Sequence, residues 1–103
     1  MLNYELRKGT LTVTLAGDID HASAPGMRVF MDNLIKKENA LYDRFVLDMS
    51  GITFMDSTAV GLIMGRYKLL KSLGKAVNFL KPSAVADKVL KVSGLYTIIN
   101  RLE

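Results

Sequence analysis

The stretch from Phe45 to Lys71 constrains the fold more than any other part of this sequence. It opens with a short apolar run, Phe45 to Leu47, which is typical of a buried strand that ends at Asp48. A connection broken by Gly51 follows, and then a helix-like segment from about Thr58 to Leu73. A strand that leads through a connection into a helix predicts one unit of an open α/β sheet. Such junctions are where ligands and partners usually meet a protein.

Three small polar residues, Asp56, Ser57 and Thr58, stand together just before this helix. Side chains of these types accept hydrogen bonds from the first free N–H groups of a helix. We therefore expect Ser57 at or beside a helix N-terminus. Helix capping is the ordinary role for any single serine in such a position.

The remainder of the chain alternates strand and helix patterns. Period-two alternation over residues 4–7 and 10–15, separated by Lys8-Gly9, predicts a β-hairpin. Ser23 is expected to cap a first helix, with Pro25 in its first turn. The apolar stripe of that helix consists of Met27, Phe30, Met31 and Leu34.

The C-terminal part continues the alternation. Residues 76–80 predict a short buried strand, and Ser83 is expected to cap a helix that Gly94 ends. Val85, Val89 and Val92 share one face of that helix, and Ile98-Ile99 suggests a last strand or an extended tail. This order predicts an α/β fold with a mixed sheet, an opening hairpin followed by mainly parallel strands.

Composition limits the classes of protein to which the chain can belong. Half of its 103 residues are hydrophobic, which argues against disorder. Cysteine is absent, which excludes a disulfide framework, a thiolate metal site and a cysteine nucleophile. We see no signal peptide and no apolar run of the ~20 residues that a membrane span needs. We expect a single cytoplasmic domain over residues 1–103, with no membrane partner.

Charge is unevenly distributed along the chain. The net charge of +4 arises from −2 up to Gly65 and +6 from Arg66 onward. A basic face attracts nucleic acid or anionic membranes. The lysines are scattered, however, and no aromatic residues interleave with them to stack on bases. We interpret them as a solvated surface and expect no direct nucleic-acid partner.

Ser57 and His21 invite comparison with a hydrolase. A nucleophile elbow needs Gly-x-Ser-x-Gly because its strained turn leaves no room for side chains, but here Met55 and Ala59 occupy the glycine positions. His21 is the only histidine, so one loop position would have to supply the catalytic base. We therefore expect no enzyme, no catalytic residue and no cofactor.

Three aspartates offer oxygen ligands to a hard cation: Asp18, Asp20 and Asp56. Their spacing matches no calcium-binding loop, and aspartates in such places more often cap turns and helices. We expect no metal site.

A helical wheel from Thr58 to Leu73 separates two faces. Val60 and Met64 fall on the same side as Ser57 and are expected to be accessible, which indicates a partner surface beneath that serine. Arg66 falls within the opposite, apolar stripe, where its long side chain would have to extend past the end of the sheet. That stripe is expected to pack on the sheet and consists of Ala59, Leu62, Ile63, Leu69, Leu70 and Leu73.

Three segments together resemble a known family. Phe54-Met55-Asp56-Ser57-Thr58, with Gly61 and then Gly65-Arg66-Tyr67-Lys68, resembles the signature of STAS domains. Within them it is most similar to the anti-sigma factor antagonists of sporulating bacteria. Gly17-Asp18-Ile19-Asp20-His21 and Val92-Ser93-Gly94-Leu95, the latter followed by Ile98-Ile99, resemble the same family. The likeness covers nearly the whole chain in the same order.

The resemblance implies a STAS fold with a mixed sheet of four to five strands and helices packed on it. It also implies a regulatory serine, Ser57 by motif position, phosphorylated by an anti-sigma factor that is also a serine kinase and reset by a serine phosphatase. Ala59 departs from the glycine that the family often has there, and its methyl group bears on how a kinase would fit. The expected partner-binding residues are Asp20, His21, Asp56, Thr58, Val60, Gly61 and Met64.

These observations predict an anti-sigma factor antagonist. Its unphosphorylated form would bind the anti-sigma kinase and release a sigma factor, and phosphorylation of Ser57 would end that binding. One alternative is a STAS module of another partner-switching or stress-signalling complex. The other, from a different class, is a small nucleotide-binding or hydrolytic domain that uses the Ser57 loop.

Overall fold

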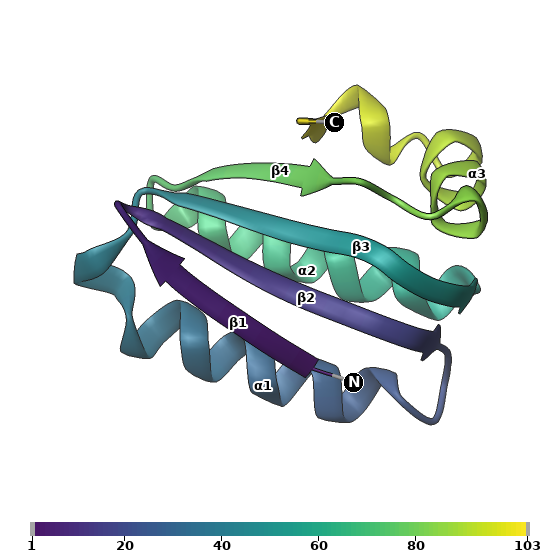
Figure 1. Ribbon diagram of the computed structural model, residues 1–103, viewed down its shortest axis with the longest axis horizontal. Helices are drawn as coiled ribbons and strands as arrows, with labels where there is room; N and C mark the ends of the chain where they lie inside the picture. The colour runs from purple at the N-terminus through teal and green to yellow at the C-terminus, as the bar shows by residue number, and fades with distance from the viewer. Residues whose placement is uncertain (1, 103) are drawn as a thin grey trace.

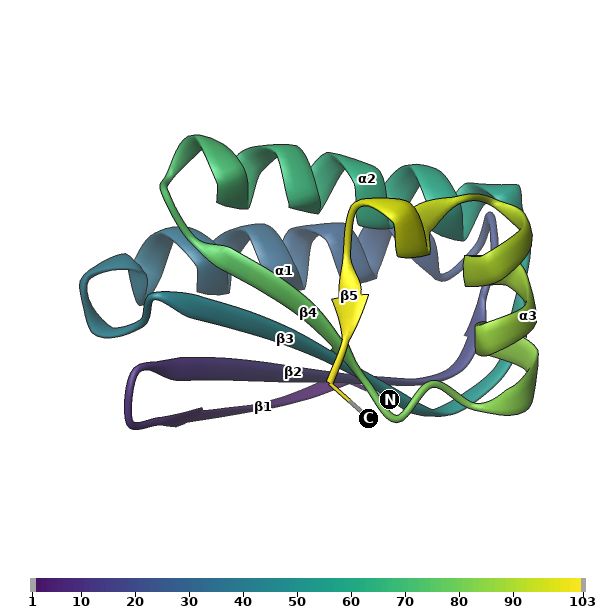
Figure 2. The same cartoon turned by 90° about the horizontal axis from the view of Figure 1, so that it is seen from above.

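The computed structural model describes residues 2–102, which form a five-stranded mixed sheet with two long helices on one face (Figures 1 and 2). The strands follow one another across the sheet in chain order, the first pair antiparallel and the others parallel, which confirms the predicted fold class. The strands are β1 (Leu2–Arg7), β2 (Thr10–Ile19), β3 (Arg44–Met55), β4 (Ala76–Leu80) and β5 (Asn100–Arg101).

Three α-helices connect the strands. α1 and α2 lie side by side on the same face of the sheet, whereas α3 lies beside the end of β3 (Figures 1 and 2). The helices are α1 (Ala24–Lys37), α2 (Ser57–Ser72) and α3 (Ala84–Val92), with single 3-10 turns at η1 (Asn39–Leu41) and η2 (Leu95–Thr97).

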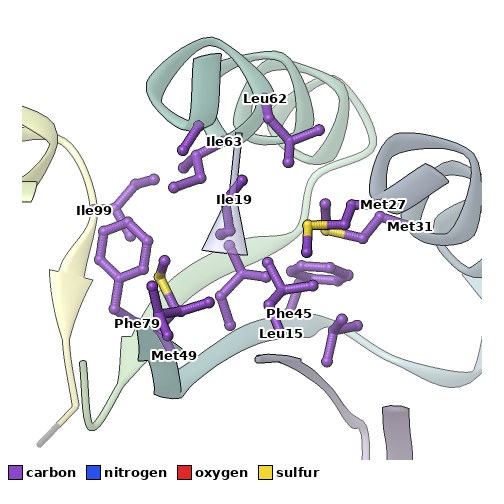
Figure 3. Close-up of a cluster of buried hydrophobic side chains, with 14 of the residues drawn as sticks. Leu15, Ile19, Met27, Met31, Phe45, Met49, Leu62, Ile63, Phe79 and Ile99 are labelled. Atoms are coloured by element: carbon purple, nitrogen blue, oxygen red, sulfur yellow. The ribbon is translucent and has the colours of Figure 1, made fainter. Parts of the chain in front are cut away.

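Apolar side chains fill the space between the sheet and the two long helices (Figure 3). Phe45 and Phe79 rise from neighbouring strands, while Met31 of α1 and Ile63 of α2 meet them from above; all four are buried. Removing a side chain of this size from water stabilises the fold by roughly 1.5–3 kcal/mol. The core therefore fixes both helices on the sheet.

β3 is longer than the sequence predicted. We expected a strand over Phe45–Leu47 and then a connection broken by Gly51, but pairing with β2 continues to the end of β3. The buried residues in its second half, Met49, Ile52 and Met55, recur at every third position because two register shifts interrupt the pairing with β2. That spacing hides the strand from a search for period-two alternation.

Two helix faces differ from the prediction. Leu73 was expected in the core but is 39% exposed, because α2 ends at Ser72 and Leu73 only caps it. In α3 the buried residues are Ala86 and Leu90, whereas Val92 is 81% exposed. The three valines dominated the pattern since an alanine contributes little to it. The last strand follows the predicted Ile98-Ile99 pair and comprises residues 100–101.

Two polar anchors fix α3. Ser83 caps the helix as predicted, accepting from the Ala86 N–H at 3.2 Å, and its hydroxyl donates to the Ile52 carbonyl of β3 at 2.7 Å. Asp87 accepts from the Tyr96 hydroxyl at 2.5 Å and from Arg101 Nη1 at 2.9 Å, which fastens the C-terminal segment. Burial and the bond to Asp87 raise the pKa of Tyr96 to about 12.

We expect Gly51→Ala to destabilise the domain. A Cβ at this position would lie 2.9 Å from the Cβ of Ala16 on β2, so the paired strands would have to separate. Overpacking of this kind costs ~1–3 kcal/mol and should lower the urea midpoint without changing the slope. Ala16→Gly in the same chain should restore most of the loss. Purely additive losses in the double variant would contradict the steric explanation.

Candidate functional site

The carboxyl ends of β2 and β3 bring two acidic segments together. Ile19 and Met55, the last residues of their strands, are paired, and each is followed by an aspartate, Asp20 and Asp56. Because the strands are parallel, both aspartates leave the sheet at the same edge, where α1 and α2 begin. We call residues 18–23 and 53–58 the carboxyl edge.

Asp56 is the residue that caps α2. It has extended backbone geometry, and its Oδ1 accepts a hydrogen bond from the Thr58 N–H at 2.9 Å. The sequence placed Ser57 at or beside the helix N-terminus, and it is the first residue of α2, with Asp56 taking the capping role. Ser57 is exposed, and its hydroxyl forms no hydrogen bond within residues 2–102. It is therefore free to react or to contact a partner.

Asp20 organises the turn that leads into α1. Its Oδ1 accepts from the N–H groups of Ala22 and Ser23, both at 3.0 Å. The hydrogen bond from the Ser23 N–H is the main reason that the pKa of Asp20 lies below its ordinary value of 3.8. The carboxylate is thus held ionised and oriented, which gives the carboxyl edge a fixed negative charge.

Further side chains brace the same turn. Ser23 is the N-cap residue of α1 and Pro25 lies in its first turn, as predicted, but the Ser23 hydroxyl makes no capping bond to the helix. Ser23 Oγ instead donates to the Asp18 carbonyl at 2.7 Å and accepts from the Asp20 N–H at 3.0 Å. Asp18 Oδ1 in turn accepts from Thr53 Oγ1 of β3 at 2.7 Å. The two halves of the carboxyl edge are therefore linked by side chains as well as by the sheet.

Two grooves flank the first half of α2. The α1/α2 groove has a volume of about 580 Å³ and contains three predicted site residues, His21, Thr58 and Gly61. The α2/α3 groove, about 400 Å³, contains Asp56, Ser57 and Val60. The other residues that line it are Met55, Lys88, Val89, Val92 and Ser93.

The helix wheel of α2 is confirmed for the core and refined for the surface. Leu62 and Ile63 are buried as expected, but Val60 and Met64 are only partly accessible because they also pack against the core. Ala59 is fully buried. Its methyl group, which departs from the family glycine, therefore lies away from any surface that a kinase could touch.

Arg66 does not extend past the sheet, and that expectation was wrong. Its Nε lies 2.9 Å from Oδ1 of Asp32 on α1, with only 12% of the arginine side chain exposed. The pair links the two helices at one wall of the α1/α2 groove. A wheel of one helix could not show this, because the partner belongs to another helix.

Sequence reasoning missed the residues that line the grooves from neighbouring helices. Arg28 of α1 lines the α1/α2 groove, and Lys88 and Val92 of α3 line the α2/α3 groove. Of these three residues, only Val92 shows an apolar pattern in the sequence, and that pattern predicted a buried helix face and not a groove. Lys88 and Val92 share a groove with Ser57, and Arg28 shares one with Thr58, only because of how the helices pack.

Residues 2–102 contain neither a metal-ligand cluster nor a membrane-spanning helix. No cluster of three or more histidines or carboxylates in that range is arranged to hold a metal ion, although Asp18 at the end of β2 and Asp20 just after it are only two residues apart. Nor does that range contain a helix with the length and apolar character of a membrane span.

Comparison with known proteins gives one family over the whole chain. The STAS domain family matches residues 1–103. The anti-sigma F factor antagonist of Paenibacillus polymyxa is 32% identical over 98 residues, which cover 95% of this chain and 82% of that protein. The anti-sigma-B factor antagonist of Bacillus subtilis (strain 168) is 28% identical over 99 residues, covering 96% of this chain and 87% of that protein.

Solved structures show the same likeness. The anti-sigma factor antagonist SpoIIAA in its unphosphorylated form superposes with a TM-score of 0.81 at 25% identity, covering 100% of this chain and 89% of SpoIIAA. The Bacillus cell fate determinant SpoIIAA in its phosphorylated form gives a TM-score of 0.73 at 25% identity, covering 100% and 92% of the two chains.

Removing the cap of α2 should weaken the fold measurably. We expect Asp56→Ala to cost ~0.5–2 kcal/mol of unfolding free energy, because the Thr58 N–H loses its acceptor. Asp56→Ser keeps an acceptor at this position and should retain most of the stability. Urea unfolding of the two variants checks this. Equal losses in both would show that Asp56 acts through something other than capping.

The pH dependence of stability should report the turn at Asp20. Its pKa is lower in the folded protein than 3.8, so its contribution is present above the unfolded pKa and disappears as pH falls through the folded pKa. Asp20→Asn should therefore flatten the acid limb of the stability curve, measured by urea unfolding from neutral to acid pH. Asp87, whose pKa is also lowered, remains in both proteins, so part of the limb should persist. An unchanged acid limb would contradict the proposed role of Asp20.

Proposed function

Because this chain belongs to the STAS domain family, we propose that it is an anti-sigma factor antagonist whose partner binding is switched off by phosphorylation of Ser57. The observation that carries the proposal is the position of Ser57: it is exposed, its hydroxyl forms no hydrogen bond within residues 2–102, and it is the first residue of α2, where it lines the α2/α3 groove. The names of the relatives, and a solved relative in unphosphorylated and phosphorylated forms, support it.

In the unphosphorylated state the carboxyl edge and the first half of α2 form the docking surface. Asp20 and Asp56 offer oriented carboxylates, and Val60 with Met64 offers apolar area that is still partly accessible. Docking of the anti-sigma factor on this surface frees its sigma factor. The partner-binding residues are Asp20, His21, Asp56, Thr58, Val60, Gly61 and Met64.

Phosphorylation acts on this surface by charge. A phosphate adds about −1.5 to −2 charges at Ser57, beside Asp56 and at the same edge as Asp20. A helix N-terminus tolerates such a group and gains ~0.3–1 kcal/mol from it. In a closed interface a like-charge contact costs several kcal/mol, which weakens binding by roughly a hundredfold or more.

The proposal also fixes the classes of partner. The anti-sigma factor carries the serine kinase activity, and a serine phosphatase resets Ser57. The antagonist itself performs no catalysis, since neither elbow position beside Ser57 is a glycine. We place its action in the cytoplasm, where a sigma factor meets RNA polymerase.

The proposal leaves two alternatives for the cognate sigma factor. The likeness to an anti-sigma F factor antagonist favours the sporulation type, while the likeness to an anti-sigma-B factor antagonist favours another partner-switching complex. Capture of partners from a lysate of the source bacterium, with identification of the bound anti-sigma factor, decides between them.

The charge of residue 57 should control binding without controlling folding. We expect Ser57→Ala to bind the anti-sigma kinase and to escape phosphorylation. Ser57→Asp should bind at least about tenfold more weakly, and the phosphoprotein more weakly still because it carries more charge. Isothermal titration calorimetry with the anti-sigma factor, and mass spectrometry after incubation with ATP, measure these outcomes.

Thermal melts separate the mechanism from unfolding. Ser57 is exposed at the start of α2, so all variants should keep melting temperatures close to that of the unmodified protein. If Ser57→Asp and the phosphoprotein bind as tightly as the unmodified protein, the proposed switch is wrong. If weak binding comes with a large fall in melting temperature, unfolding rather than repulsion explains the loss.

A further inference from the structure

The residues that line the α1/α2 groove include basic side chains and no carboxylate, and the nearby Asp32 carboxylate is already paired with Nε of Arg66. The residues lining it that can carry charge are His21, Arg28 and Arg66. Arg28 is exposed and forms no ion pair within residues 2–102. A concave surface with charges of one sign and apolar walls concentrates the field and attracts a group of opposite sign.

Arg66 is only partly engaged by its own fold. Its side chain is 12% exposed, and its contact with Asp32 is made through Nε. Neither terminal nitrogen donates a hydrogen bond to any of residues 2–102. A guanidinium has five N–H donors in a planar fork that suits a carboxylate. Nε is the fully buried nitrogen of this guanidinium, so the terminal nitrogens in the groove wall stay open to an acceptor from another molecule.

Two glycines keep the groove open. Gly61 and Gly65 lie one turn apart in α2 and line the groove. A Cβ on either would meet nothing within 4 Å, so close packing inside the domain does not require glycine there. Glycine inside a helix lowers stability relative to alanine because it loses more backbone freedom on folding. The two glycines therefore keep the groove open at some cost in the stability of α2.

From these three features we infer that the α1/α2 groove receives a glutamate or aspartate side chain from the anti-sigma factor. Arg28 and the terminal nitrogens of Arg66 pair with its carboxylate. This inference rests on the proposed function and names the chemistry of the partner segment. The groove holds about 580 Å³, which is ample for one acidic side chain.

A protein segment suits the groove better than a free anion. Its walls include apolar side chains, among them Ala24, Val29 and Leu62, which can cover the methylene groups of an acidic residue. His21 and Thr58 also line it and belong to the proposed docking surface, so a partner at the carboxyl edge would reach the groove without a gap. The partner would then contact two arginines in the groove as well as the carboxylates of the carboxyl edge.

The steric half of the test uses Gly65→Ala, titrated calorimetrically against the anti-sigma factor that the unmodified protein binds. The new methyl group enters the groove, so affinity should fall roughly tenfold while the melting temperature rises by about 2–8 °C. The matched control is Gly26→Ala. Gly26 is an exposed glycine of α1 with nothing near its Cβ position, and it does not line the groove. This control should leave affinity within about twofold.

The electrostatic half uses Arg28→Glu, with Arg7→Glu on β1 as its control. Arg7 is exposed and outside the groove, so both changes alter net charge equally and only one alters the groove. We expect Arg28→Glu to weaken binding roughly tenfold and to reduce the dependence of affinity on salt. Exchange of one acidic residue of the anti-sigma factor for lysine should restore binding to Arg28→Glu, which identifies the carboxylate.

The outcomes separate this inference from the proposed function. If Gly65→Ala and Arg28→Glu bind like the unmodified protein while Ser57→Asp does not, the switch stands and the groove inference is wrong. A lower melting temperature in Gly65→Ala, with unchanged affinity in Arg28→Glu, also overturns it, because Gly65 is then structural. If the unmodified protein binds no anti-sigma factor, the proposed function and this inference fail together.

Discussion

The parallel pairing of β2 with β3 is the interaction on which the rest of the structure depends. It runs from Thr10 opposite Arg44 to Ile19 opposite Met55 and places buried side chains of both strands beneath α1 and α2. Because both strands end together, both helices begin at one edge, and the groove between them opens there. The bond from Ser83 to a β3 carbonyl adds α3 to the same edge. One ladder of backbone hydrogen bonds thus positions residues that are far apart in sequence.

The fold was predictable where a side-chain pattern repeats at the period of one element. The hairpin, the apolar stripe of α1 and the buried face of α2 all follow from such periods. The extension of β3 beyond Asp48 was not predictable. Its register shifts against β2 place the buried residues three positions apart, which is not the period of a regular strand. The buried face of α3 was not predicted for a related reason. Ala86 is small, so it adds little to an apolar pattern, and its burial depends on the neighbouring β3.

The site was predictable in its sequence-local parts only. The polar run Asp56-Ser57-Thr58 predicted the start of a helix. The cap forms because an aspartate side chain can accept a hydrogen bond from the backbone N–H two residues later, here that of Thr58. The basic lining of the α1/α2 groove combines residues from two helices, and no pattern along one helix shows that Arg66 meets Asp32. The partial burial of Val60 and Met64 has the same origin, because a helical wheel gives the direction of a side chain and not what the rest of the fold places over it.

The position of Ser57 separates what a phosphate would do to the fold from what it would do to a complex. In the free protein the phosphate faces the N–H groups of the first turn of α2, a gain of ~0.3–1 kcal/mol. It also faces the Asp56 carboxylate, whose repulsion at 4 Å is about 1 kcal/mol per unit charge in water. For a phosphate of about −1.5 to −2 charges that repulsion is roughly 1.5–2 kcal/mol, which exceeds the helix-terminus gain by about 1 kcal/mol, so the modification would change folding only slightly. When a partner closes over the edge and displaces water, the effective dielectric constant falls toward about 20, and the same repulsion grows to about 4 kcal/mol per unit charge. A charge placed at an exposed helix start therefore acts on binding, and the sheet needs no conformational change to transmit it.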